Sequence, residues 1–171
     1  MNHFHETATL DLPIDILHED DNFVVVNKPP SYVVYPISCH RMSSVQFILM
    51  RERGYKDLKT VHRLDKLTSG VLIFGKGTET SNRLSNRFDL SLGGGDRPVQ
   101  KQYLALVDGE FPLGKIFEDS PLSDYVVNTL VGRSKCTKPK EAVTEFERLD
   151  YDGNVSLVQC TPKTGRTHQI R

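Results

Sequence analysis

The sequence predicts an α+β protein built on a mixed, largely antiparallel sheet. Short runs of β-branched and aromatic residues recur along the chain, and turn-forming residues separate many of them. Helical patterns interrupt these runs irregularly rather than after every strand. Tight links between strands favour antiparallel pairing, because a parallel pair needs a long crossover connection. A doubly wound parallel sheet is therefore not expected.

The first elements follow from alternation and capping signals. Residues 10–17 (LDLPIDIL) alternate apolar and polar side chains, and residues 23–27 (FVVVN) predict a buried strand. Ser43 and Gln46 have the spacing of a capping box, so a helix is expected after them, ending at Gly54.

The next strand is predicted at residues 71–74 (VLIF), directly before a second helix. Thr78 is the expected cap of this helix, which we expect to run towards Leu90. Leu84 and Phe88 would form its core-facing stripe, because they are one turn apart.

The second half of the chain contains three further predicted strands, after a loop that is flexible by composition at residues 91–97 (SLGGGDR). These strands are residues 103–107, 142–149 and 155–160. Thr167 is the expected cap of a last helix that begins as the sequence ends.

Composition indicates a folded protein of one domain. Of the 171 residues, 37% are hydrophobic and 26% are charged, which excludes a disordered tail and a coiled coil. No stretch approaches the roughly 20 apolar residues of a membrane span. Three scattered cysteines do not make a disulfide framework, so a reducing compartment is expected.

The charges are balanced overall, with 22 basic and 22 acidic residues, but they are unevenly distributed. Residues 1–22 carry six acids and no Lys or Arg, and we treat them as an acidic lead-in. The remainder has a surplus of six basic groups, enough for a modest basic face towards nucleic acid or for an ordinary mixed surface.

Several common motifs are absent. The sequence has no Walker loop, GxGxxG, GxSxG or CxxC, so it does not support a nucleotide cradle, a serine-hydrolase elbow or a zinc ribbon. Cys39 and His40 are adjacent, and adjacent ligands rarely form a tetrahedral metal site.

The polar segment 62–65 (HRLD) precedes Thr68, Ser69 and the strand at 71–74. A carboxylate at Asp65 would lie in a loop beside Arg63, whose charge favours an ionised base or nucleophile. Because the same residue types are common in turns, a structural turn is the alternative.

A second polar cluster covers residues 163–171 (KTGRTHQIR). Cations at a helix N-terminus oppose the helix dipole and hint at an anionic partner, although a solvated basic turn explains them equally well. Tyr103, in the segment 101–105, is the third candidate, and strand tyrosines more often serve packing than catalysis.

The order of these segments resembles the RluA-type family of RNA pseudouridine synthases. HRLD followed by TSG, with GRTHQIR about a hundred residues later, carries the resemblance. It extends from about Phe23 to the last residue, and the long match at 62–76 is most similar to eukaryotic members. The matching segments are residues 24–36 (VVVNKPPSYVVYP), 62–76 (HRLDKLTSGVLIFGK), 101–110 (KQYLALVDGE) and 163–171.

The resemblance implies that residues 23–171 form a pseudouridine synthase catalytic domain that isomerises uridine to pseudouridine in RNA, without a metal or organic cofactor. Asp65 would be the catalytic aspartate. Tyr103 would stack on the target base and assist proton transfer, and Arg171 would pair with the aspartate. Arg63 would contact RNA near the flipped nucleotide, while Arg166 and His168 would have positioning roles.

The implied partner is tRNA, rRNA or another structured RNA. We expect a monomer that acts inside the cell, and the sequence does not distinguish between cytoplasm, nucleus and mitochondrion. Ser31 and Tyr35 occupy places where relatives usually have Gly and His. The family continues beyond HQIR, so we expect a catalytic domain that is incomplete at its C-terminus, with poor activity and stability for these 171 residues alone.

Two alternatives remain at this point. One is a catalytically inactive RNA-binding module of the same fold. The other is a glycoside hydrolase, which would need a second carboxylate about 5–9 Å from Asp65, and the sequence indicates no obvious one.

Overall fold

The computed structural model describes residues 6, 8–37, 39–88, 99–123, 125–128, 133–136 and 138–171. The chain divides into two compact units, Met1–Phe88 and Asp89–Arg171, and each is described by itself. The loop expected at residues 91–97 and the helix end expected at Leu90 lie outside the described residues. None of the described helices is long and apolar enough to cross a membrane.

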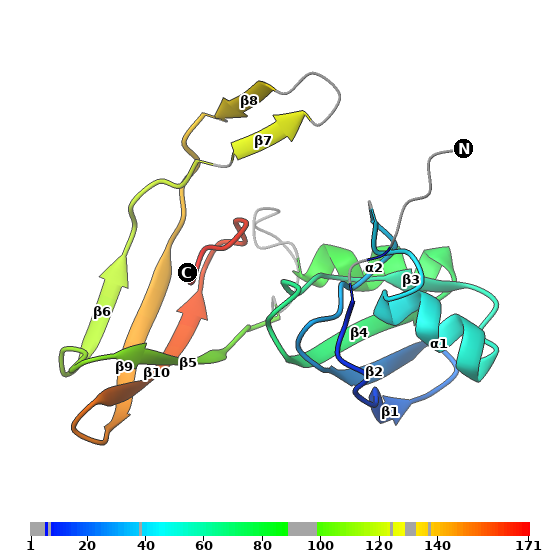
Figure 1. Cartoon of the computed structure of the whole chain (residues 1–171), viewed down its shortest axis with the longest axis horizontal. Helices are drawn as coiled ribbons and strands as arrows, with labels where there is room; N and C mark the ends of the chain where they lie inside the picture. The colour runs from blue at the N-terminus through cyan, green and yellow to red at the C-terminus, as the bar shows by residue number, and fades with distance from the viewer. Residues whose placement is uncertain are drawn as a thin grey trace. The chain divides into compact units, whose positions relative to one another are not determined.

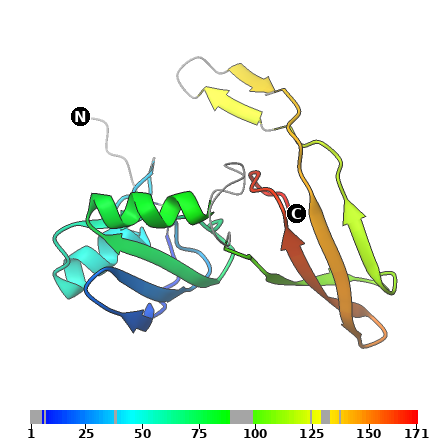
Figure 2. The ribbon, with the colours of Figure 1, turned by 180° about the vertical axis from the view of Figure 1, so that it is seen from behind.

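The first unit is a four-stranded sheet with two helices (Figure 1). Its strand order is β1-β2-β4-β3, and the strand pairs are antiparallel. Figure 1 shows α1 in front of this sheet, and the reverse view in Figure 2 brings α2 to the front. The elements are β1 (Asp15–Glu19), β2 (Phe23–Lys28), α1 (Val45–Arg53), β3 (Leu58–Thr60), β4 (Gly70–Lys76) and α2 (Thr78–Phe88).

Period-two alternation builds the core of this sheet. Val24 and Val26 of β2 are fully buried and stand opposite Phe74 and Leu72 of β4, which are fully buried too. Neighbouring side chains on one face of an antiparallel pair pack directly against each other, so these four residues form one apolar layer. Among the buried core residues of α1 are Val45 and Leu49.

Helix α1 begins one residue later than the capping box predicts. Ser44, not Ser43, is the N-cap, and its hydroxyl accepts the N–H of Phe47. The backbone explains the difference, because Ser44 forms a β-bridge with Val33 and therefore marks the turn into the helix. The predicted stop is confirmed: Gly54 adopts φ 73°, a left-handed conformation that glycine adopts without a Cβ penalty.

Helix α2 contacts β4 through small residues. Thr78 is its first residue rather than its cap, and Ser81, not Leu84 or Phe88, is the side chain that is fully packed. A Cβ placed on Gly75 would lie 2.9 Å from the main-chain N and Cα of Ser81. This close approach requires glycine at position 75. Leu84 and Phe88 are half-buried on the same face of the helix as Ser81, as the sequence predicts.

The second unit contains a four-stranded antiparallel sheet of order β5-β10-β9-β6 and a separate β7–β8 hairpin (Figure 2). Its strands are β5 (Tyr103–Asp108), β6 (Lys115–Glu118), β7 (Tyr125–Asn128), β8 (Arg133–Cys136), β9 (Thr144–Tyr151) and β10 (Val155–Pro162).

The predicted fold class is confirmed, since the named strands pair antiparallel in both units and two helices lie in the first. The alternating segment 10–17 forms a strand only from Asp15, because the N–H and C=O of Leu12 bond to the Tyr32 hydroxyl (3.2 and 3.3 Å) instead of a neighbouring strand. The last helix, expected after Thr167, is not formed. Residues 167–170 form a turn rather than a helix, because His168 has φ 56°.

Candidate active site

Asp65 lies in a tight turn between β3 and β4. The N–H of Thr68 donates to the Asp65 carbonyl (3.1 Å), which closes the turn. Leu64 is buried beneath it, Asp65 is half-buried, and Arg63 is exposed. The HRLD segment therefore anchors itself through an apolar side chain and directs its arginine to the surface.

His62 connects this segment to the sheet. Its Nε2 accepts the N–H of Ile73 in β4 (3.2 Å), and its ring stacks on Phe88, with the centroids 4.4 Å apart and the planes 5° from parallel. Because an imidazole nitrogen that accepts a hydrogen bond carries no proton, the other nitrogen holds the proton in the neutral ring. The first residue of the motif thus has a structural role.

Lys28, at the end of β2, is fully buried, and the sequence analysis assigned it no role. Its ammonium donates three hydrogen bonds to main-chain carbonyls: Pro29 (2.9 Å), Tyr32 (2.8 Å) and Lys66 (3.1 Å). All three ammonium protons are therefore used. The signal in the sequence was the alternation of Val24, Val26 and Lys28, which places the lysine on the buried face of the strand.

The charge of Lys28 is coupled to Asp65. Burial lowers the pKa of Lys28 to about 8, and the negative charge of Asp65 opposes that shift. At neutral pH the lysine is still an ammonium, so a buried cation supports the turn that carries the predicted catalytic carboxylate.

Tyr103, the predicted base-stacking residue, is the first residue of β5 in the second unit. It pairs with Cys160 of β10, and its side chain is half-buried. Cys160 in turn pairs with Phe146 of β9, so the tyrosine belongs to an apolar row across three strands. Burial also raises the pKa of the Cys160 thiol.

Gln169 organises the turn at residues 163–171, and the sequence analysis gave it no role either. Its amide oxygen accepts from the Arg166 N–H (2.8 Å) and the Thr164 hydroxyl (2.9 Å). Its amide nitrogen donates to the Val143 carbonyl (3.0 Å) and the Thr144 hydroxyl (2.9 Å). One side chain therefore attaches this turn to the start of β9.

The other members of the motif follow from this attachment. Arg166 donates from Nε to the Glu141 carbonyl (2.8 Å), a second link between the turn and the segment before β9. The Arg171 N–H donates to the His168 carbonyl (2.9 Å), and both side chains are exposed. The positioning roles of Arg166 and His168 stay predictions.

The predicted site residues therefore fall into two sets. Arg63 and Asp65 lie in the segment between β3 and β4 of the first unit, while Tyr103, Arg166, His168 and Arg171 lie in the second unit. The pairing of Asp65 with Arg171 joins two units and stays a prediction. Among the described residues, no group of three His, Cys, Asp or Glu side chains is arranged to hold a metal ion.

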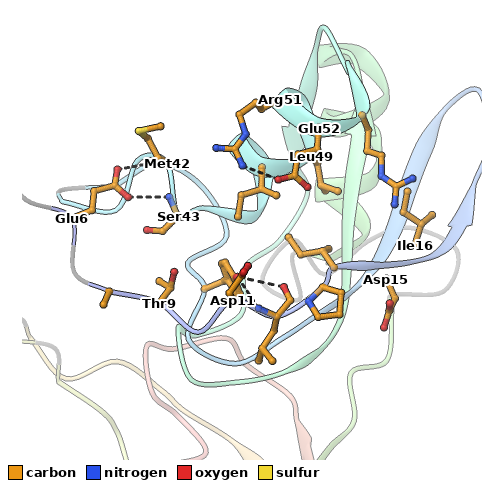
Figure 3. Close-up of a pocket in the computed structure, with 17 residues that line it drawn as sticks. Glu6, Thr9, Asp11, Asp15, Ile16, Met42, Ser43, Leu49, Arg51 and Glu52 are labelled. Atoms are coloured by element: carbon orange, nitrogen blue, oxygen red, sulfur yellow. Dashed lines mark hydrogen bonds and ion pairs between the residues drawn. The ribbon is translucent and has the colours of Figure 1, made fainter.

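A pocket of about 980 Å³ lies elsewhere in the first unit, between the N-terminal segment and α1 (Figure 3). Its lining includes Leu12, Ile16 and Leu49 together with charged side chains such as Glu6 and Arg51. None of the six predicted site residues lines it. The predicted site residues and this pocket are therefore separate features of the described structure.

Comparison with known proteins places the chain in one family. A family model described as RNA pseudouridylate synthase matches residues 22–171. The chain belongs to this family. Pseudouridylate synthase RPUSD2 of Homo sapiens is 41% identical over 170 residues, which cover 99% of this chain and 30% of that protein.

Two further relatives support the assignment. The protein named tRNA pseudouridine(32) synthase, mitochondrial, of Saccharomyces cerevisiae is 34% identical over 173 residues, covering 99% of this chain and 36% of that protein. The solved structure of Human RNA Pseudouridylate Synthase Domain Containing 4 has a TM-score of 0.63 and 28% identity, and covers 91% of this chain and 61% of that chain. The chain spans about a third of the length of the two curated relatives.

Proposed function

We propose that the protein isomerises uridine to pseudouridine in RNA, with Asp65 as the catalytic residue. The observation that carries the proposal is the family match over residues 22–171 together with the Asp65 turn, which a buried lysine supports from beneath. RNA pseudouridylate synthesis is a chemistry that one carboxylate can begin without a redox cofactor.

The reaction requires three changes at the target nucleotide. The N1–C1′ bond breaks, the uracil turns, and C5 bonds to C1′, with no net oxidation. An ionised Asp65 can begin the sequence by attack at C1′ or C6, or by removing a sugar proton in a glycal-like route. All three routes need a carboxylate that is held still beside the flipped nucleotide.

We assign the supporting roles to the second unit. Tyr103 would stack on the everted uracil, which offsets about 1–3 kcal/mol of the unstacking cost. Arg171 would pair with Asp65, and Arg63 would bind the RNA backbone beside the target. Arg166 and His168 would hold the turn that presents Arg171.

For the substrate we propose a structured RNA, tRNA or rRNA. The yeast relative is named for tRNA, and a 34% identical relative from Vibrio vulnificus is named Ribosomal large subunit pseudouridine synthase C. We expect the protein to act as a monomer inside the cell, in the cytoplasm, the nucleus or the mitochondrion.

The test compares the unsubstituted protein with the Asp65→Asn variant. For each protein, the affinity for cellular RNA and the formation of pseudouridine are measured separately. We expect Asp65→Asn to bind RNA within about twofold of the unsubstituted protein and to form no pseudouridine, a loss of at least about 10³-fold. Asp57→Asn is the matched control, because Asp57 is an exposed carboxylate paired with Lys59 (3.0 Å). An intact protein that binds RNA but forms no pseudouridine would indicate the non-catalytic RNA-binding module instead.

A further inference from the structure

A chain of four side chains extends from the residue that follows Asp65 to the N-terminal segment. Lys66 Nζ lies 3.4 Å from His40 Nε2, and His40 Nδ1 lies 3.3 Å from the Ser43 hydroxyl. The Ser43 hydroxyl also bonds to the Glu6 carboxylate. All four side chains are half-buried.

The donor and acceptor of each hydrogen bond in this series follow from the chemistry of the side chains. A lysine ammonium only donates, so His40 Nε2 is the acceptor and carries no proton. His40 Nδ1 then carries the proton of the neutral ring and donates to the Ser43 hydroxyl. That hydroxyl in turn donates to the Glu6 carboxylate. Every donor therefore points from the Asp65 turn towards Glu6.

Both ends of this hydrogen-bond chain, Glu6 and Lys66, are held by further contacts. The Glu6 carboxylate accepts the main-chain N–H groups of Arg41 (2.8 Å), Met42 (2.5 Å) and Ser43 (3.0 Å), two of which are drawn in Figure 3. These bonds and the Ser43 hydroxyl lower the pKa of Glu6. At the other end, the Lys66 carbonyl accepts a hydrogen bond from the Lys28 ammonium (3.1 Å).

The main chain of His40 is held as well, because its N–H donates to the Ile37 carbonyl (2.9 Å) and its carbonyl accepts from the Ile37 N–H (3.3 Å). A ring held in this way has little freedom to follow a moving lysine. Lys66, the residue next to Asp65, is thus held at two points: Lys28 binds its carbonyl, and His40 binds its ammonium.

We propose that His40, in its neutral form with the proton on Nδ1, is a positioning residue that holds Lys66 and through it the Asp65 turn. The proposal rests on the function proposed above. Among the four side chains of this hydrogen-bond chain, Lys66 and Glu6 carry charge. Cys39 and Arg41 flank His40 in the sequence. A second proton on the ring would remove the acceptor for Lys66 and place two cations together.

The first experiment reads the tautomer directly in the intact protein, by long-range ¹H–¹⁵N NMR of the imidazole at about pH 8. We expect the His40 proton on Nδ1. A proton on Nε2, or a doubly protonated ring at that pH, would overturn the proposal. This measurement does not depend on catalysis, so it separates the proposal from the proposed function.

The second experiment compares two substitutions at His40 by kcat and KM for pseudouridine formation. His40→Gln keeps an acceptor and a donor, whereas His40→Leu keeps neither. We expect His40→Leu to lower kcat roughly tenfold at about pH 7.5 with little change in KM, the loss of one charge-assisted hydrogen bond at a positioned turn.

His40→Gln, which keeps an acceptor for Lys66, should stay within about twofold of the unsubstituted protein in kcat at about pH 7.5. His18→Gln is the matched control, because His18 lies on β1 beside Asp20 (3.5 Å), and it should leave kcat and KM unchanged. A kcat for His40→Leu equal to that of the control, or a loss of kcat in His40→Gln as large as in His40→Leu, would contradict the proposal. An unsubstituted protein that forms no pseudouridine at all would refute the proposed function instead, and the tautomer would still decide the hydrogen-bond chain.

Discussion

The Lys28 ammonium donates a hydrogen bond to the main-chain carbonyl of Lys66 over 3.1 Å, one residue beyond Asp65. This contact connects the end of a buried strand to the turn that carries the predicted catalytic carboxylate. With two further bonds, to the carbonyls of Pro29 and Tyr32, the same ammonium also fixes the loop after β2. A charge that is expensive to bury is here satisfied completely, and the Asp65 turn gains a rigid support.

Removing this hydrogen-bond donor should destabilise the protein. In Lys28→Met the three carbonyls lose their donor, so we expect the free energy of unfolding to fall by about 3 kcal/mol. Urea unfolding of the intact protein measures it. Lys59→Met, which removes an exposed lysine paired with Asp57, should change stability by less than about 0.5 kcal/mol. Equal stability of the two variants would show that Lys28 does not support the fold.

The pKa of Lys28 adds a dependence on pH. Burial lowers this pKa from 10.5 to about 8, against the charge of Asp65, so between these values the unfolded chain binds more protons than the native one. The stability of the unsubstituted protein relative to Lys28→Met should therefore rise through this window, by at most about 1.4 kcal/mol per pH unit. Below about pH 8 both states hold the proton and the difference should be constant. A difference that falls as the pH rises would contradict this sign.

Gln169 should matter for both stability and activity. Gln169→Leu leaves the Arg166 N–H and the Thr164 hydroxyl without their acceptor, so we expect a loss of about 2 kcal/mol in the free energy of unfolding. Because the same turn carries Arg171, kcat should fall as well. Gln102→Leu is the control at an exposed position, and it should alter neither quantity. Thermal unfolding and single-turnover rates of both variants test this, and an unchanged Gln169→Leu would refute it.

The contact between β4 and α2 predicts the effect of one added methyl group. In Gly75→Ala the new Cβ would meet the main chain of Ser81 at 2.9 Å, and backbone cannot move aside as a side chain can. We expect a loss of about 1–3 kcal/mol in the free energy of unfolding. No atom lies within 4 Å of a Cβ at Gly165, so Gly165→Ala should be nearly neutral. Denaturant midpoints that shift equally in the two variants would contradict the close approach.

Much of the sheet was predictable, because β-branched runs such as residues 23–27 and alternation such as residues 103–107 mark strands that bury one or both faces. The short strands β3 and β6 were missed, because three or four residues with charged neighbours show no clear period. The choice of Ser44 over Ser43 as N-cap depends on a bridge to Val33, a contact that local sequence does not encode. Tertiary pairing decided the details that propensity left open.

The candidate site was predictable in part. The HRLD segment is a half-buried turn, as its residue types indicate, and the resemblance supplied the role of Asp65. Lys28 and Gln169 were not identified, because a buried lysine and a glutamine become informative only when their partners are known. The pairing of Asp65 with Arg171 remains a prediction, since it joins residues of two units.

The central claim is that the Asp65 carboxylate converts uridine to pseudouridine in RNA. The most direct measurement is transcriptome-wide pseudouridine mapping in cells that lack the gene, complemented with either the unsubstituted protein or Asp65→Asn at equal abundance. We predict that the unsubstituted protein restores a defined set of pseudouridines and that Asp65→Asn restores none of them. Restoration of the same sites by Asp65→Asn would contradict the claim.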